Sequence, residues 1–129
     1  MTPELKVLAL AAILQYIQFL LMGIPLNIQL GVQATAGPRD GGLKVMGVAG
    51  RLYRAFNNHF EALILFTIAV VVVTLSDQST PYTAACAWAY LISRILYIPA
   101  YISGIPFLRT AVFTVGFGAT LAMILSVLI

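Results

Sequence analysis

The stretch RLYRAFNNHFEA, residues 51–62, gathers polar side chains within an otherwise apolar sequence. Those that recur at spacings of three and four residues are Arg51, Arg54, Asn58 and Glu61. On a helix this spacing places all of them on one face. Arginines bind anionic groups in a planar, bidentate geometry, and a carboxylate inside a membrane can pair with a cation or exchange a proton. This face could therefore hold a charged ligand.

A second polar face follows in the stretch AYLISRILYIPAYISGIPFLR, residues 89–109. Its polar members, again three and four residues apart, are Tyr90, Arg94, Tyr97 and Tyr101, and Arg109 comes shortly after them. Guanidinium and phenol groups both donate hydrogen bonds, so this face also suits an anion.

The chain that must position these faces has 129 residues, of which 61% are hydrophobic and 9% are charged. Soluble domains carry about 25% charged residues, so this chain has too few charges to cover a surface that faces water. A helix needs about 20 mainly apolar residues to cross a bilayer. We count four such segments, at about residues 5–30, 54–75, 82–102 and 108–129. The sequence therefore predicts an all-α membrane protein, a bundle of four transmembrane helices that forms one domain over residues 1–129.

Basic residues lie mainly on one side of the four predicted spans. That side holds Arg39, Lys44, Arg51, Arg54 and Arg109, whereas the opposite side holds Lys6. Lys and Arg accumulate in short cytoplasmic loops, so we predict a cytoplasmic arginine-rich side and non-cytoplasmic termini. The net charge of +3 suits anionic lipid headgroups, and no nucleic-acid-binding motif accompanies it.

Glu61 and Arg94 are predicted to lie at similar depths in the membrane. Glu61 is about 15 Å from Arg51 along its helix, and Arg94 is about 12 Å below the cytoplasmic end of its span. A charged side chain at that depth is costly unless it is paired, so we expect an ion pair between Glu61 and Arg94. We favour a mainly structural role for this pair, which would hold two helices together.

The other polar residues of the two faces allow alternative interpretations. An arginine cluster at the mouth of a bundle, here Arg51, Arg54 and Arg109, is predicted to receive an anion, although long basic side chains also reach toward headgroups. Tyr97 and Tyr101 extend the polar face toward this cluster and predict a cationic, tyrosine-lined cleft that opens to the cytoplasm. The alternative is that both belong to an interfacial aromatic belt.

Two further residues are interpreted as bystanders. His59 lies off the polar face of its span and has no second metal ligand, so no metal site is predicted. Cys86, the single cysteine, lies among alanines and is expected to pack inside the bundle or against lipid. No phosphate-binding loop, dinucleotide fingerprint or zinc-protease motif occurs in the sequence.

The stretch RLYRAFNNHFEA, together with SRILYIPAYISGIPFLR at residues 93–109, resembles the signature of the membrane-associated proteins in eicosanoid and glutathione metabolism, the MAPEG family. This family includes microsomal glutathione transferases, leukotriene synthases and prostaglandin E synthase. The positions that fit its pattern are Arg51, Arg54, Ala55, Asn58, Glu61, Arg94, Tyr97, Tyr101 and Arg109.

The resemblance implies a homotrimer of four-helix bundles that binds glutathione between neighbouring subunits near the cytoplasmic face. By the same analogy, the glutathione-binding residues are Arg51, Arg54, Asn58, Glu61, Tyr97 and Tyr101, and Arg94 supports Glu61. Arg109 would hold the thiol as thiolate, which is the nucleophilic form that a nearby guanidinium favours. The expected function is a glutathione-dependent transferase or peroxidase whose lipophilic electrophile arrives from the bilayer.

The sequence departs from the family transferases at the cytoplasmic end of the first span. Basic residues usually help to hold a glutathione carboxylate there, whereas this chain has Asn27, Gln29 and Gln33. Two alternatives therefore stay open, a non-catalytic protein that binds lipids or fatty acids and a small proton-coupled exporter. Glu61 distinguishes them, because an exporter needs this carboxylate unpaired in an open cavity. The sequence does not identify the electrophile, and it does not separate transferase from peroxidase or isomerase.

Overall fold

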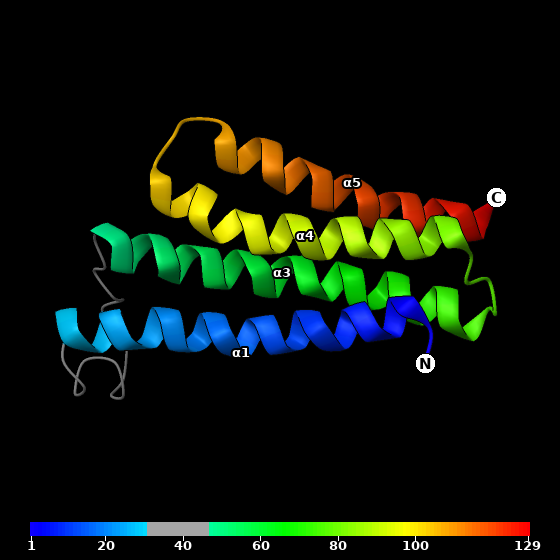
Figure 1. Ribbon diagram of the computed structural model, residues 1–129, viewed down its shortest axis with the longest axis horizontal. Helices are drawn as coiled ribbons and strands as arrows, with labels where there is room; N and C mark the ends of the chain where they lie inside the picture. The colour runs from blue at the N-terminus through cyan, green and yellow to red at the C-terminus, as the bar shows by residue number, and fades with distance from the viewer. Residues whose placement is uncertain (31–46) are drawn as a thin grey trace.

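A computed structural model describes residues 1–30 and 47–129 of the chain. Its helices are α1 (Pro3–Leu30), α3 (Gly47–Leu75), α4 (Pro81–Ser103) and α5 (Leu108–Leu128), and no strand occurs within these two ranges. The helices run side by side along the long axis of the molecule, with α5 packed on α4 at the side away from α1 (Figure 1). Both chain termini lie at one end of the bundle, which we call the terminal end. The other end, where α4 turns into α5, is called the arginine end.

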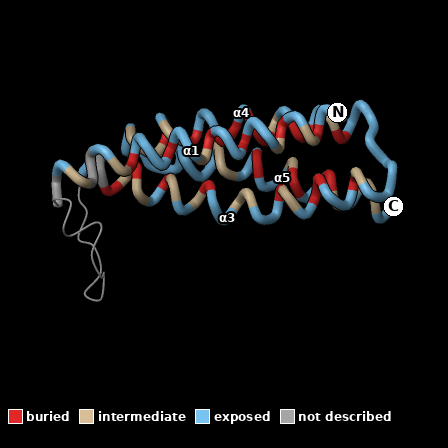
Figure 2. Tube along the Cα trace, turned by 90° about the horizontal axis from the view of Figure 1, so that it is seen from below, coloured by how far each residue is buried: buried red, intermediate tan, exposed pale blue. Residues whose placement is uncertain are grey.

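Each of the four helices contains a segment long and apolar enough to cross a membrane. Large apolar side chains are exposed along their outer faces, including Ile13, Leu20, Ile68, Ile92 and Leu125. The buried positions lie mostly on the sides of the helices that face one another (Figure 2). An exposed apolar surface of this kind needs lipid around it. The chain is therefore an integral, multi-pass membrane protein, and the expected all-α bundle with four spans is confirmed.

Helices α1, α3 and α4 begin before the apolar segments from which they were predicted. The second helix begins at Gly47 instead of near residue 54, so Arg51 and Arg54 both lie on α3. A count of apolar residues measures the hydrocarbon core, whereas a helix can continue into the polar headgroup layer. Gln33, Arg39 and Lys44, together with the loop-like stretch AGPRDGG at residues 36–42, lie outside the described residues.

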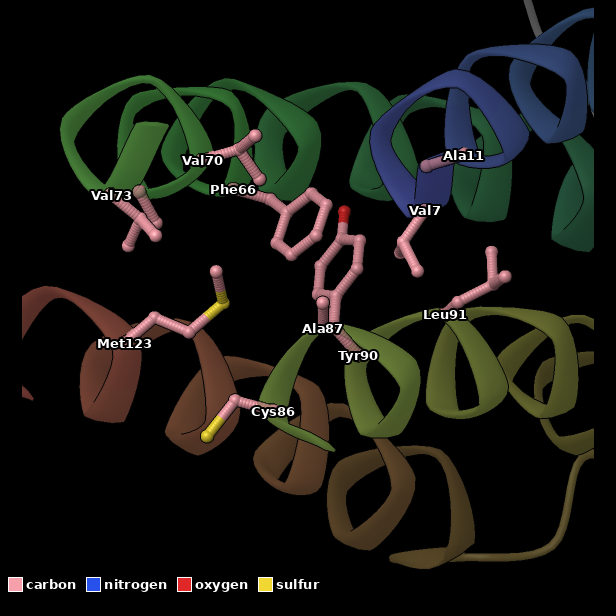
Figure 3. Packing of buried hydrophobic residues seen from close by; sticks show 11 residues of the cluster. Val7, Ala11, Phe66, Val70, Val73, Cys86, Ala87, Tyr90, Leu91 and Met123 are labelled. Carbon is pink, nitrogen blue, oxygen red and sulfur yellow. The ribbon is translucent and has the colours of Figure 1, made fainter. Parts of the chain in front are cut away.

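The apolar core fills the terminal half of the bundle. Phe66 of α3 stacks on Tyr90 of α4 with ring centroids 3.9 Å apart and planes 5° apart, and Val7 of α1 lies beside them (Figure 3). Cys86 is buried in the same cluster, as expected for a packing cysteine. Stacked rings within a close-packed cluster leave little freedom for α4 to rotate, which fixes the direction of its polar face.

Glu4 ties the terminal end together, although the side chain is completely buried. Its carboxylate accepts hydrogen bonds from Ser79 Oγ at 2.8 and 2.9 Å and from Thr83 Oγ1 at 2.7 Å. Thr80 and Thr83 form a capping box at the start of α4. These bonds satisfy the buried carboxylate and fix the start of α4 against α1.

Helix α5 approaches α4 closely at Gly116. A Cβ atom at this position would collide with the Ser93 hydroxyl, whereas a Cβ at Gly118 would meet nothing within 4 Å. Gly116 is buried and Gly118 is exposed. The close contact at Gly116 therefore sets how near α5 can lie to α4 beside the polar face.

Candidate functional site

Arg94 is buried in the middle of α4 with 1% of its surface exposed. Its Nε donates a hydrogen bond to His59 Nδ1 at 3.4 Å. The Tyr97 ring covers one face of the guanidinium, with Arg94 Cζ 4.3 Å from the ring centroid. A buried guanidinium is costly, and a cation–π contact with a charge-assisted hydrogen bond offsets part of this cost.

The expected ion pair between Glu61 and Arg94 is wrong for the part of the chain that the structure describes. Glu61 is exposed on α3 and has no hydrogen-bond or ion-pair partner there. The spacing of residues along a helix predicts the depth of Glu61 and Arg94 in the membrane. Whether the two side chains meet also depends on how each helix is rotated about its own axis. The side of α3 that meets Arg94 carries His59, which is fully buried and is therefore not a bystander.

A cavity of about 340 Å³ lies between α3 and α5 with α4 as its floor, and we call it the inner cavity. Its polar lining residues are Asn58, Glu61, Tyr90, Arg94 and Thr120. One guanidinium nitrogen of Arg94, Nη2, and the amide oxygen of Asn58 are buried without a partner. The other walls are mainly apolar and include Phe113, Phe117 and Leu121. The inner cavity thus combines charged groups of both signs with an apolar wall.

A second cavity of about 490 Å³ lies at the arginine end and is called the outer cavity. Its charged lining residues are Arg51, Arg54 and Arg109, and no acidic residue among the described ones lines it. Arg54 Nε donates to the Tyr101 hydroxyl at 3.0 Å, and Arg109 Cζ lies 4.8 Å from the centroid of the same ring. Such a cluster of guanidinium groups without acids is suited to an anion.

Arg51 has a structural contact in addition to its place in the outer cavity. Its Nη1 donates to the carbonyl of Ile102 at 2.8 Å, in the last turn of α4. The guanidinium also lies against Gly104, whose φ of 72° ends α4 in the left-handed conformation. Arg51 therefore caps the C-terminus of α4 and also lines the outer cavity.

Tyr97 contacts both Arg94 of the inner cavity and Tyr101 of the outer cavity, but Tyr97 itself lines neither cavity. The rings of Tyr97 and Tyr101 meet edge to face with centroids 5.6 Å apart. Tyr97 is 4% exposed and lies over Arg94, so it packs inside the bundle and does not belong to an interfacial belt. Arg94 and Tyr101 are seven residues apart on one helix, which corresponds to about 10 Å. We call the two neighbouring cavities together the elongated site, with the buried Tyr97 between Arg94 and Tyr101.

Residues 7–129 match the model of the MAPEG family. The chain belongs to the MAPEG family. Searches among curated proteins and among solved structures find no match. The match spans four membrane helices, so the resemblance that began at residues 51–109 covers nearly the whole chain. The protein is therefore a membrane protein of a family related to glutathione and eicosanoid metabolism.

Most MAPEG motif positions line one of the two cavities, whereas Ala55 and Tyr97 are buried and line neither. Asn58, Glu61 and Arg94 line the inner cavity, and the outer cavity is lined by Arg51, Arg54, Tyr101 and Arg109. Among the described residues, no group of three or more His, Cys, Asp or Glu side chains is placed to hold a metal ion.

Sequence reasoning missed two parts of this MAPEG site. The first is His59, and the signal that could have identified it is the need of every ionisable side chain inside a membrane for a partner. The second is the apolar wall that α5 contributes through Phe113, Phe117 and Leu121. No pattern distinguishes these residues from the lipid-facing residues of the same helix.

Proposed function

We propose that this MAPEG protein is a glutathione-dependent transferase or peroxidase that acts on lipophilic electrophiles. The observation that carries the proposal is that Glu61 and Arg94 line one cavity without pairing with each other. Both charges are then available to a ligand group that is itself zwitterionic. The γ-glutamyl end of glutathione is such a group, since it carries an ammonium and a carboxylate on the same carbon.

The length of the site also fits a tripeptide. An extended chain of three residues spans about 10 Å, which is close to the separation of Arg94 and Tyr101 along α4. With its γ-glutamyl end at Glu61 and Arg94, glutathione would place its glycine carboxylate in the outer cavity. Arg54 and Arg109 line that cavity and would bind this second carboxylate or the neighbouring thiolate.

The chemistry would take place between these two ends. Arg109 would favour the thiolate of glutathione, whose sulfur donates an electron pair to an electrophilic carbon as the S–C bond forms. The bond from that carbon to its leaving group breaks, and the leaving group takes the electron pair and then a proton from water. The apolar walls at Phe117 and Leu121 would hold the lipophilic part of the electrophile.

Exposure of Glu61 supports assembly into an oligomer. A charged carboxylate that faces lipid within a span costs several kcal/mol, so a neighbouring subunit that covers Glu61 and leaves the α5 side of the inner cavity open to lipid would remove that cost. We propose a homotrimer by analogy with the family, with one domain per chain over residues 1–129. We also propose that the arginine end faces the cytoplasm, because basic residues accumulate on that side of a membrane.

The unpaired Glu61 favours a second candidate as well, a small proton-coupled exporter. A carboxylate in an open cavity can bind either a proton or a cationic substrate, and so can exchange one for the other. A third reading, a protein that binds fatty acids without catalysis, would use Arg94 and the apolar wall but would not need Glu61. The role of Glu61 therefore separates the three functions.

The test is calorimetric titration of glutathione into the purified protein in detergent. Arg54→Ala and Arg109→Ala are titrated in parallel, and Lys6→Ala serves as a matched control because Lys6 lies exposed at the terminal end. Saturable binding that is lost in Arg54→Ala and kept in Lys6→Ala supports the glutathione enzyme. The absence of binding at millimolar glutathione would refute it and leave the exporter and the lipid-binding protein.

A further inference from the structure

We propose that His59 is a positioning residue. It holds the Arg94 guanidinium so that the two terminal nitrogens, and not Nε, are directed toward the inner cavity. The proposal deepens the function proposed above, because it concerns how the same site recognises a carboxylate. The hydrogen bonding of His59 to Ala11 and Arg94, however, can be tested without glutathione. Two hydrogen bonds of the His59 ring, one to Ala11 of α1 and one from Arg94 of α4, link three helices and carry the proposal.

The two hydrogen bonds require one particular form of His59. Arginine has only donors, so His59 Nδ1 must accept the bond from Arg94 Nε and carries no proton. The other ring nitrogen, Nε2, lies 3.0 Å from the carbonyl oxygen of Ala11, which can only accept. Nε2 therefore carries the proton and donates it. Both contacts are satisfied together only by the neutral ring with its proton on Nε2.

The backbone of α1 is the fixed end of this chain. The Ala11 carbonyl belongs to the middle of α1, and Ala11 and His59 are both completely buried. A ring bonded to a helix backbone cannot turn without losing that bond. His59 thus presents Nδ1 in a fixed direction, and Arg94, which is otherwise a long and flexible side chain, is fixed through its Nε.

The consequence for a ligand is a restriction on how Arg94 can bind it. A guanidinium can hold a carboxylate either through Nε and one terminal nitrogen or through its two terminal nitrogens. His59 occupies Nε, and the Tyr97 ring covers one face. Nη2 remains buried and without a partner, and Arg94 lines the inner cavity. A carboxylate in that cavity would therefore bind end-on, at the terminal nitrogens alone.

The first test needs no ligand, and it uses the fact that His59 is the only histidine of the chain. The untagged protein labelled with ¹⁵N-histidine gives ring nitrogen signals from this residue alone. We expect the neutral form protonated at Nε2, with an Nδ1 shift that changes on Arg94→Lys. Three results would overturn the proposal. They are a ring protonated at Nδ1, a charged ring, and a ¹⁵N chemical shift of Nδ1 that is the same in the wild-type protein and in Arg94→Lys.

The second test separates positioning from packing with a set of His59 variants. His59→Asn keeps an acceptor near the place of Nδ1, whereas His59→Gln keeps a polar group near Nε2 and His59→Leu keeps neither. We expect glutathione affinity to fall about tenfold in His59→Gln and His59→Leu and to fall less in His59→Asn, which keeps the acceptor for Arg94 Nε but loses the bond to the Ala11 carbonyl. Thermal unfolding of each variant identifies a general loss of fold. Equal affinity in all three folded variants would contradict a positioning role.

A double-mutant cycle shows whether His59 acts through Arg94. If it does, His59→Leu has no further effect on glutathione affinity in an Arg94→Lys background, whereas independent effects would add. Additive losses would overturn the proposal. If the wild-type protein binds no glutathione, the proposed function fails while the histidine spectrum still decides the geometry. The two failures are thereby distinguishable.

Discussion

The Arg94 guanidinium meets the His59 ring, with Nε 3.4 Å from Nδ1, and it does not meet the Glu61 carboxylate. Two opposite charges therefore line one cavity without neutralising each other. Had they paired, the inner cavity would offer little charge to a ligand. Because the charges of Glu61 and Arg94 are not paired, the site can recognise a ligand group that carries both a positive and a negative charge.

Glu61→Gln should lower glutathione affinity about tenfold. The neutral amide cannot attract an ammonium group as a carboxylate does, and a hydrogen bond to a charged group contributes about 1.5–3 kcal/mol. Calorimetry of the variant checks this loss. A glutathione analogue without the α-amino group is the control, because it should bind the wild-type protein and Glu61→Gln equally. If glutathione binds both proteins equally, Glu61 does not contact the ammonium.

Arg109→Ala should lower the fraction of bound glutathione that is thiolate, because the adjacent positive charge is lost. We expect the rate of conjugation with a model electrophile to fall at least about tenfold, whereas Arg109→Lys should recover part of it. Ultraviolet absorbance of the thiolate on mixing protein with glutathione measures the first effect. An unchanged thiolate signal in Arg109→Ala would assign thiol activation to another residue.

Gly116→Ala should destabilise the packing of α5 on α4 by about 1–3 kcal/mol, since the new Cβ collides with the Ser93 hydroxyl. Gly118→Ala is the matched control on the same helix, and with open space around it this variant should be neutral or slightly stabilising. Thermal unfolding in detergent measures both. Combining Gly116→Ala with Ser93→Ala should restore most of the lost stability, and failure to do so would place the strain elsewhere.

Thr83→Val should destabilise the terminal end by about 1–3 kcal/mol, because Glu4 loses a hydrogen bond while it stays buried. The same change removes the capping box at the start of α4. Thr114→Val is the control, since this exposed threonine bonds only to the carbonyl of Thr110 within its own helix. Equal unfolding temperatures for the two variants would show that Glu4 does not depend on Thr83.

Helical spacing alone predicted which polar residues share a face. Asn58 and Glu61 are three residues apart and line the same cavity, as the period of the helix requires. The partner of Arg94 was not predictable in this way. His59 follows Asn58 directly and is turned by about 100° around α3, so it faces α1 and α4 and not the cavity. Only the packing of three helices determines that it meets Arg94.

The mouth of the inner cavity lies on the lateral surface of the bundle. Leu65, Phe117 and Leu121 line it and are each about half exposed there, at 45%, 50% and 48%. A lipophilic molecule that enters between α3 and α5 therefore comes from the surrounding lipid or detergent. Occupancy would then follow the mole fraction of that molecule in the lipid phase. If the affinity for this molecule is calculated from its concentration in the whole sample, the apparent affinity would fall as lipid is added, although the protein itself has not changed.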